Sequence, residues 1–162
     1  MKAKTNKMEI IWERYSFFIS FLLGLFTGIL YYFQLITNIR SVLSEVISFA
    51  SIVVGINGVF ITLVISIKTT TAFKRLIKYL PDFEDRLIKL LKSQVMVGLI
   101  VVLLSILILL LPISSNLILS SIGVVIWSFF FILMSIGSFF TMNIIMKIIS
   151  ANHEDPKASK RP

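Results

Sequence analysis

The chain has 162 residues, 57% of them apolar, a formal net charge of +8 and no cysteine. Without cysteine, the protein has no disulfide, no thiol nucleophile and no thiolate metal site. The length and the mean hydropathy of +0.95 fit one membrane domain and leave no room for a separate soluble domain. The positive charge flanks apolar segments, so membrane topology and anionic lipid headgroups explain it more simply than nucleic acid does.

Four long apolar runs, separated by polar segments, dominate the chain. A helix needs about 20 apolar residues to cross about 30 Å of hydrocarbon, and each run comes close to this length. We therefore predict an all-α, polytopic integral membrane protein with four transmembrane helices in a single domain, residues 1–150, followed by a disordered cytoplasmic tail, residues 151–162. The predicted crossings are residues 16–36, 47–67, 94–111 and 117–140.

The distribution of Lys and Arg predicts the orientation of these crossings. Fifteen of the sixteen basic residues fall on one side, and Arg40 alone falls on the other. Because cytoplasmic loops carry the excess of Lys and Arg, we predict that both termini and the middle loop are cytoplasmic, beside the anionic inner leaflet of a bacterial inner membrane. The fifteen residues are Lys2, Lys4, Lys7, Arg14, Lys68, Lys74, Arg75, Lys78, Arg86, Lys89, Lys92, Lys147, Lys157, Lys160 and Arg161.

The middle loop, residues 68–93, carries a helical pattern of its own. An apolar stripe with helical spacing begins at Phe73, and a second begins at Phe83. Between the two stripes, Pro81 ends one helix and Asp82 is a suitable N-cap for the next. We predict a cytoplasmic helical hairpin that is continuous with helices two and three. A basic amphipathic segment lying flat on the inner leaflet is the alternative.

Small residues recur at helical spacing along the first, second and fourth crossings. Such stripes let two helix backbones approach closely, where dispersion and Cα–H contacts act without a hydrophobic driving force between helices. The amide of Asn57 needs a partner at membrane depth, which predicts a helix interface or a wet cavity. A tight helix seam and the lining of an oligomeric pore remain as two interpretations of the second crossing. We predict packing roles for Ser20, Gly24, Gly28, Ser51, Gly55, Asn57, Gly58, Thr62, Ser121, Ser128 and Ser135.

The residues absent from the crossings exclude several functions. No Asp, Glu, Lys, Arg or His lies inside a predicted crossing, which argues against a proton-driven pump. Catalysis is equally unsupported, because His153 lies in the polar tail. The acids Asp82, Glu84 and Asp85 are better explained by stabilisation of a helix N-terminus. We expect no enzyme activity, no cofactor and no metal site.

Basic side chains of the middle loop alternate with aromatic ones, a composition that suits the docking of a soluble protein. Contact with lipid headgroups is the simpler alternative, and direct contact with nucleic acid is the least favoured. The predicted docking residues are Lys68, Phe73, Lys74, Arg75, Lys78, Arg86, Lys89 and Lys92.

In its size, its four crossings, its two inward termini and its long basic hairpin, the chain resembles small membrane subunits of bacterial anti-phage defence systems, such as the membrane subunit of Kiwa. The resemblance covers most of the chain as topology, and no diagnostic motif carries it. It implies a homo-oligomer in the inner membrane that works with a cytoplasmic, DNA-binding partner acting on phage DNA.

Our hypothesis for function is a non-enzymatic scaffold or sensor that self-associates through its small-residue faces and docks a cytoplasmic partner on the hairpin. A change at the membrane alters helix packing, and the hairpin transmits it. The alternative is an oligomeric pore or membrane-disrupting effector, similar to a toxin or a holin, with the second crossing as its lining. A carrier for a neutral substrate is neither supported nor excluded by the residues.

Overall fold

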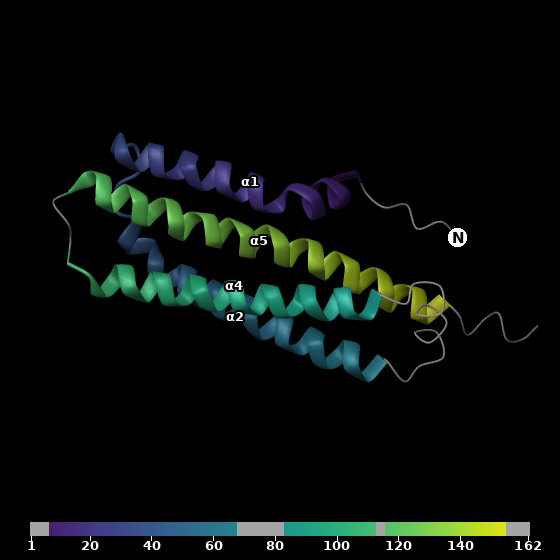
Figure 1. The fold of residues 1–162 in the computed structure, drawn as a ribbon. Coiled ribbons are helices and arrows are strands. Elements are labelled where there is room, and N and C mark those ends of the chain that lie inside the picture. The colour runs from purple at the N-terminus through teal and green to yellow at the C-terminus, as the bar shows by residue number, and fades with distance from the viewer. Residues whose placement is uncertain (1–6, 68–82, 113–115, 155–162) are drawn as a thin grey trace, which may run out of the picture.

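The computed structural model describes residues 7–67, 83–112 and 116–154, and within these ranges every regular element is an α-helix. The helices run side by side, alternately up and down, in an elongated bundle (Figure 1). The first arm of the predicted hairpin, residues 68–82, lies outside the described residues. The helices are α1 (Lys7–Tyr32), α2 (Ile39–Ile67), α4 (Phe83–Leu110) and α5 (Leu117–Glu154).

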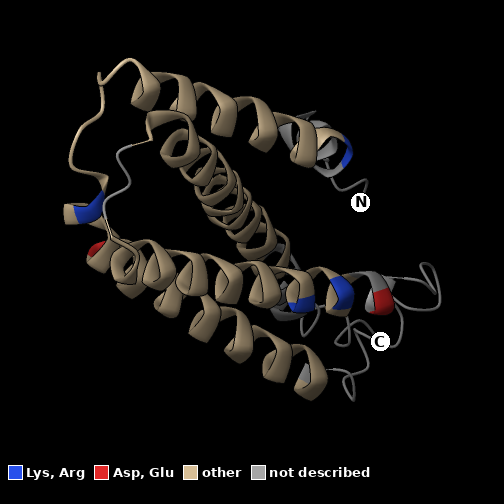
Figure 2. Cartoon of the chain, turned by 60° about the vertical axis from the view of Figure 1, so that its left-hand side comes forward, with Lys and Arg blue, Asp and Glu red and all other residues tan. Residues whose placement is uncertain are grey.

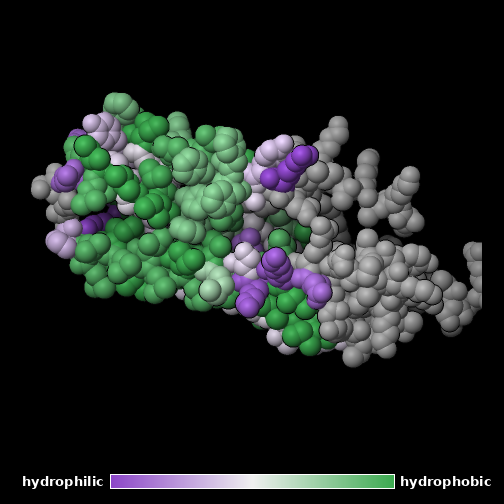
Figure 3. Space-filling model, in the orientation of Figure 1, coloured by the Kyte–Doolittle hydropathy of each residue, from purple (hydrophilic) through white to green (hydrophobic). Residues whose placement is uncertain are grey.

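All four described helices are long and apolar enough to cross a membrane. Hydrocarbon offers backbone N–H and C=O groups no water, so long apolar runs form helices, which pair these groups internally. Hydrophobic side chains cover the middle of the visible face, and hydrophilic ones gather toward its ends (Figure 3). The prediction of an all-α chain with four helices long and apolar enough to span a membrane is confirmed for the described residues. The candidate spans are Arg14–Tyr32, Ile39–Ser66, Leu87–Leu110 and Leu117–Met146.

The helices form two antiparallel pairs that meet along α4 and α5. In one pair α1 packs against α5, and in the other α2 packs against α4. Contact between α2 and α5 is slight, and the main contact of α1 is with α5 alone. α1 and α2 therefore stand on the two outer sides of the bundle, as the turned view in Figure 2 shows.

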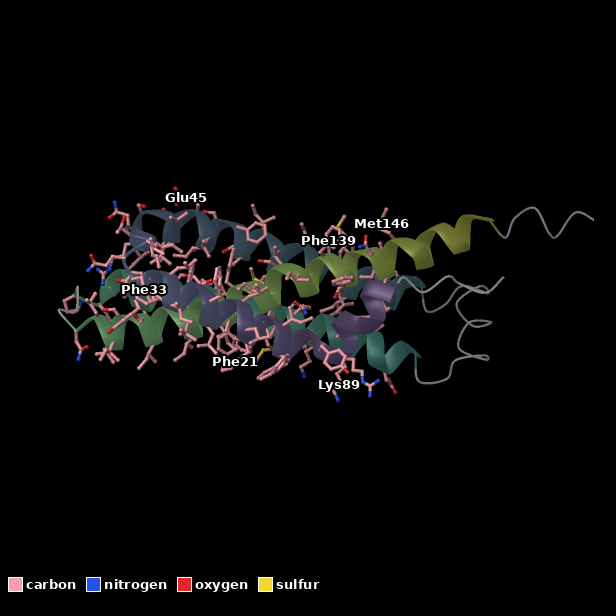
Figure 4. The ribbon with its side chains drawn as sticks, turned by 90° about the horizontal axis from the view of Figure 1, so that it is seen from above. Phe21, Phe33, Glu45, Lys89, Phe139 and Met146 are labelled. Carbon is pink, nitrogen blue, oxygen red and sulfur yellow. The ribbon has the colours of Figure 1, made fainter. Side chains whose placement is uncertain are left out.

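Charged side chains divide between the two ends of the bundle. Arg14 lies on the N-terminal part of α1, and Asp85, Lys89 and Lys92 lie on that of α4; we call this end of the bundle, where α5 finishes, the basic end. Arg40 and Glu45 lie near the start of α2, at what we call the opposite end, where Figure 4 labels Glu45. The long apolar middle separates the two sets, as expected for helices that cross hydrocarbon.

α1 ends at Tyr32, short of the predicted end of the first crossing. Gln34 adopts a left-handed conformation, with φ of 57°. Its N–H donates to the carbonyl of Tyr31 at 3.0 Å, and the N–H of Leu35 donates to the carbonyl of Leu30 at 3.0 Å. These two bonds form a Schellman motif, which satisfies the last carbonyls of a helix and ends it. Apolar residues beyond the motif lengthen the hydropathic run without lengthening the helix.

α2 begins at Ile39, earlier than the predicted second crossing, residues 47–67. Leu43, Val46 and Ala50 are buried in the core, at the spacing of three and four that places side chains on one helix face. Polar residues between them face outward, so the hydropathic pattern does not show the helix here. Residues 37–46, which separate the first two predicted crossings, therefore belong mostly to α2.

Polar contacts at the opposite end satisfy backbone groups at the helix ends. Arg40 Nη2 donates to the carbonyl of Leu111 at 2.7 Å, directly after α4. A cation at a helix C-terminus satisfies a carbonyl that lacks a partner within the helix and interacts favourably with the helix dipole. Asn116 is the N-cap of α5, because its Oδ1 accepts the N–H of Ile118 at 3.1 Å and that of Leu119 at 3.5 Å.

Two apolar clusters hold the bundle together. One cluster lies toward the basic end and joins Val64 of α2, Leu87 and Leu91 of α4 and Ile145 of α5. Leu87 and Leu91 lie on α4, which runs without interruption from Phe83 into the predicted third crossing; the hairpin itself stays a prediction. The other cluster joins residues of α2, α4 and α5, namely Leu43, Val46, Ala50, Val101, Trp127 and Met134.

α5 continues further than the sequence pattern suggests. It ends at Glu154, so residues 151–154 are helical rather than part of a disordered tail. The apolar run reaches Ile149, and the first proline after it is Pro156, so the sequence contains no helix-breaking residue before that point. Residues 155–162 lie outside the described residues.

Replacing Gln34 with glycine should stabilise the turn after α1, because glycine adopts the left-handed conformation without a Cβ clash. We expect the free energy of unfolding to rise by about 0.5–1 kcal/mol, seen as a higher thermal midpoint in detergent. The matched control is Gln34→Ala, which keeps the Cβ and should leave the midpoint unchanged. A midpoint for Gln34→Gly at or below that of the native chain contradicts the prediction.

Candidate functional site

The small residues of α1 form a tight seam with α5. Ser20, Gly24 and Gly28 share one face of α1, and all three are buried. A Cβ added to Gly24 would lie 3.1 Å from backbone atoms of Phe129, so the two helix backbones nearly touch at this point. A Cβ added to Gly28 would overlap a γ-methyl group of Val125. Glycine is therefore required for the approach of α1 to α5.

On the α5 side of this seam, one of the predicted serines reaches across. Ser128 is buried, and its hydroxyl contacts the carbonyl of Val124 at 2.7 Å and that of Gly24, on α1, at 3.3 Å. Ser121 and Ser135 instead donate to carbonyls of their own helix at 2.8 Å. The predicted serine seam thus makes one described interhelical hydrogen bond, while the other hydroxyls are satisfied four residues back.

The small residues of α2 have a different environment. Ser51, Gly55, Gly58 and Thr62 are exposed, and no atom lies within 4 Å of a Cβ built on Gly55 or Gly58. Asn57 belongs to the same predicted set but points into the bundle, where it is 1% exposed. We call the exposed stripe the open face of α2; within the described chain, no other helix covers it.

Asn57 is part of a buried polar junction that joins three helices. Its Nδ2 donates to Ser138 Oγ on α5 at 3.3 Å, and Ser138 Oγ donates to Gln94 Oε1 on α4 at 3.4 Å. Gln94 is 8% exposed and lies against Gly137, where a Cβ would overlap its amide. The junction gives Asn57 the partner that its depth requires.

A second polar contact joins α4 to α5 closer to the opposite end. Trp127 Nε1 donates to Ser105 Oγ at 2.8 Å, and both side chains are buried. The Trp127 ring stacks on that of Phe131, with centroids 5.6 Å apart and planes 3° from parallel. A buried indole N–H normally has such a partner, so this contact fixes the position of Trp127 between the helices.

The docking residues predicted from the sequence are described only in part. Lys89 and Lys92 are exposed on α4, one turn apart. Arg86 belongs to α4, but its side chain is outside the described set. Figure 4 shows Lys89 near the basic end, far along the bundle from Glu45 and Phe33. The remaining five predicted docking residues, Lys68, Phe73, Lys74, Arg75 and Lys78, lie outside the described residues.

Several residues that join the helices were not singled out from the sequence. Gln94 marks the start of a predicted crossing, and its place as the one amide in that run is the feature that indicates a buried partner. Trp127 and Ser105 sit on runs too apolar to show which face is buried. Their pairing depends on the register between α4 and α5, which no pattern within one helix determines.

Taken together, the described residues form four apolar helices of membrane-spanning length, with a glycine seam between α1 and α5, a buried polar junction at Asn57 and an open small-residue face on α2. Among the described residues, no three His, Cys, Asp or Glu side chains lie close enough to hold a metal ion. Comparison of the chain with protein-family models, with curated proteins and with solved structures finds no match in any of the three.

Replacing Gly28 with alanine should loosen the α1–α5 seam, because the new methyl group overlaps the stiff, β-branched side chain of Val125. We expect the free energy of unfolding to fall by about 1–3 kcal/mol, measured as a lower thermal midpoint in detergent. Adding Val125→Ala to the same chain should recover much of this loss. Gly123→Ala is the control, since nothing lies within 4 Å of its Cβ, and equal midpoints for the two alanine variants would contradict the prediction.

Proposed function

We propose that the protein is a non-enzymatic scaffold or sensor subunit of a bacterial inner membrane, which self-associates along α2 and docks a cytoplasmic protein on the basic segment 68–93. One contrast supports this proposal most. The small-residue faces of α1 and α5 are filled by contacts within the chain, whereas the face of α2 is open. The positive-inside rule gives the orientation, with the basic end in the cytoplasm.

We assign self-association to α2 because the small-residue faces of α1 and α5 already contact each other within the chain. The sequence suggests small-residue contacts between copies on the first, second and fourth crossings. α1 and α5 place these residues against each other, so a second copy has the open face of α2 as its remaining small-residue surface. A parallel pair of such faces is self-complementary, and twofold contacts of this kind are the commonest in homo-oligomers.

The hydroxyl groups of α2 favour a dry seam over the lining of a pore. Ser51 donates to the carbonyl of Ile47 at 2.8 Å, and Thr62 donates to that of Gly58 at 3.3 Å. Ser48 makes the same bond four residues back, at 3.0 Å. A hydroxyl paired with its own helix needs no water, so this face can pack against another helix at little cost.

The docking proposal is supported by the positive charge of the basic end. Lys89 and Lys92 are exposed on the part of α4 that precedes the predicted third crossing, and Arg14 is exposed on α1 at the same end. Asp85 is exposed one turn before Lys89, so the described exposed residues of this end carry a net positive charge rather than positive charge alone. A surface of net positive charge steers a partner of the opposite charge and fixes its orientation. The partner proposed here is accordingly a soluble protein with an acidic surface.

The resemblance to the membrane subunit of Kiwa suggests a biological setting. That family implies a homo-oligomer that works with a cytoplasmic, DNA-binding partner. An oligomeric membrane scaffold with a basic cytoplasmic surface is compatible with it, so we place the proposed function in anti-phage defence. The resemblance is one of topology, and the proposal for α2 does not depend on it.

Placing leucine at Gly55 and Gly58 should block self-association, because the bulky side chains hold two α2 backbones apart. We expect the oligomer seen in mild detergent to shift to a monomer, measured by light scattering of the purified protein. Gly123→Leu is the matched control, since Gly123 also has open space around it but lies on α5. An unchanged oligomer in the double leucine variant would remove α2 as the interface.

Reversing the charge of Lys89 and Lys92 to glutamate should release a soluble partner recovered with the tagged protein from its native host. The expected loss is about tenfold or more for two charges at a docking surface, measured by quantitative mass spectrometry. Membrane insertion and oligomer size should remain as in the native chain. Recovery of the partner at the native level contradicts docking on α4, and membrane depolarisation on expression without any partner favours the pore.

A further inference from the structure

The contact between α4 and α5 is made differently in its two halves. Toward the opposite end, the Trp127–Ser105 hydrogen bond has a donor–acceptor distance of 2.8 Å, within the range of strong bonds. The same indole stacks on Phe131, and both Trp127 and Ser105 are buried. This half of the contact is fixed by one short polar bond and a large flat aromatic pair.

Toward the basic end, the polar junction is weaker. Its two hydrogen bonds measure 3.3 Å, from Asn57 to Ser138, and 3.4 Å, from Ser138 to Gln94. Both exceed the usual upper limits of about 3.2 Å for N–H donors and about 3.0 Å for O–H donors. Two buried amides are thus held by long bonds through one hydroxyl group, at a depth where few other partners exist.

Gly137 permits this junction. The Gln94 amide occupies the space where a side chain at position 137 would begin, and the amide carbon lies 2.9 Å from the ideal Cβ position. Any larger residue at this position must push the end of Gln94 aside, and with it the bond to Ser138. The junction therefore depends on the missing side chain at position 137, because a single methyl group there is enough to displace the Gln94 amide.

We infer that the Asn57–Ser138–Gln94 junction is a latch, and that the Trp127–Ser105 contact is the pivot around which α4 and α5 separate when the latch opens. Opening moves the basic end of α4 away from α5. That part of α4 carries Lys89 and Lys92 on its exposed side and Leu87 and Leu91 on its buried side.

The latch gives the proposed docking function a means of regulation, and in this respect the inference rests on that function. A change in the packing of α5 alters the position of the α4 lysines, so membrane-embedded contacts and the cytoplasmic surface become coupled. Leu87, 4% exposed and in one cluster with Ile145 of α5, reports the same opening without any partner present.

The test uses a single cysteine at position 87. The native chain has no cysteine, so the introduced thiol is the only one that can be alkylated. The alkylation rate of Leu87→Cys is measured in native membranes, alone and combined with Gly137→Ala or Ser138→Ala. The first variant displaces Gln94, and the second removes the bridging hydroxyl. We expect each to raise the rate about fivefold, a typical coupling between two states. Gly123→Ala, on the same helix with open space around it, should leave the rate unchanged.

Hydrogen–deuterium exchange of the full chain in nanodiscs separates latch opening from general loosening. Faster exchange confined to the first turns of α4 supports the latch. Equal alkylation rates in all backgrounds would overturn it, and so would faster exchange that extends through Ser105 and Trp127. Neither measurement involves a partner or a second copy, so the latch and the proposed docking function fail independently of each other.

Discussion

The bundle depends on how closely its helix backbones approach one another. Lipid tails are as apolar as leucine, so burying leucine between two helices gains little, and association relies on close packing and on polar contacts. Glycine makes that packing available at each major contact. Gly24 and Gly28 let α1 pack closely against α5, and Gly98 of α4 leaves room for a methyl group of Val54 on α2. Gly137 leaves room for an amide, so one residue type serves both apolar and polar contacts.

Polar groups are few in the apolar middle, and most of them have a defined partner. Hydroxyl groups on α2 and α5 donate to the carbonyl four residues earlier, which leaves helix surfaces free to face lipid or another helix. Ser20 is the described exception, fully buried with no hydrogen-bond partner. Arg40 illustrates the same principle at the opposite end, because this cation donates to the carbonyl of Leu111, which follows the end of α4.

The sequence predicts the elements of this fold better than their contacts. Long apolar runs and the placement of basic residues suffice to predict four helices of membrane-spanning length and the charge difference between the two ends of the bundle. The ends of the helices are harder to predict from the sequence than the helices themselves. The turn after Tyr32 depends on a left-handed Gln34, and the start of α2 depends on Leu43 and Val46 being buried beneath polar neighbours.

For the candidate site too, the sequence predicts features of single helices but not the contacts between helices. Asn57 and the stripe around Gly55 can be identified on one helix, because their spacing is a property of that helix. Their separation into an inward amide and an outward stripe comes from the position of α4 and α5. Similarly, Gln94 and Ser138 become a pair through the register of two helices, and a pattern within one helix contains no information on that register.

The pairing of α1 with α5 has a consequence for biosynthesis. Along the chain, α2 and α4 lie between α1 and α5, and the main contact of α1 is with α5. Because a ribosome makes a chain from its N-terminus, the glycine face of α1 is made before the helix that it packs against, whereas α2 and α4 follow each other in the order of the described helices. The α1–α5 seam therefore forms only after α5 has been made, and a chain that stops before α5 leaves the glycine face of α1 without its partner.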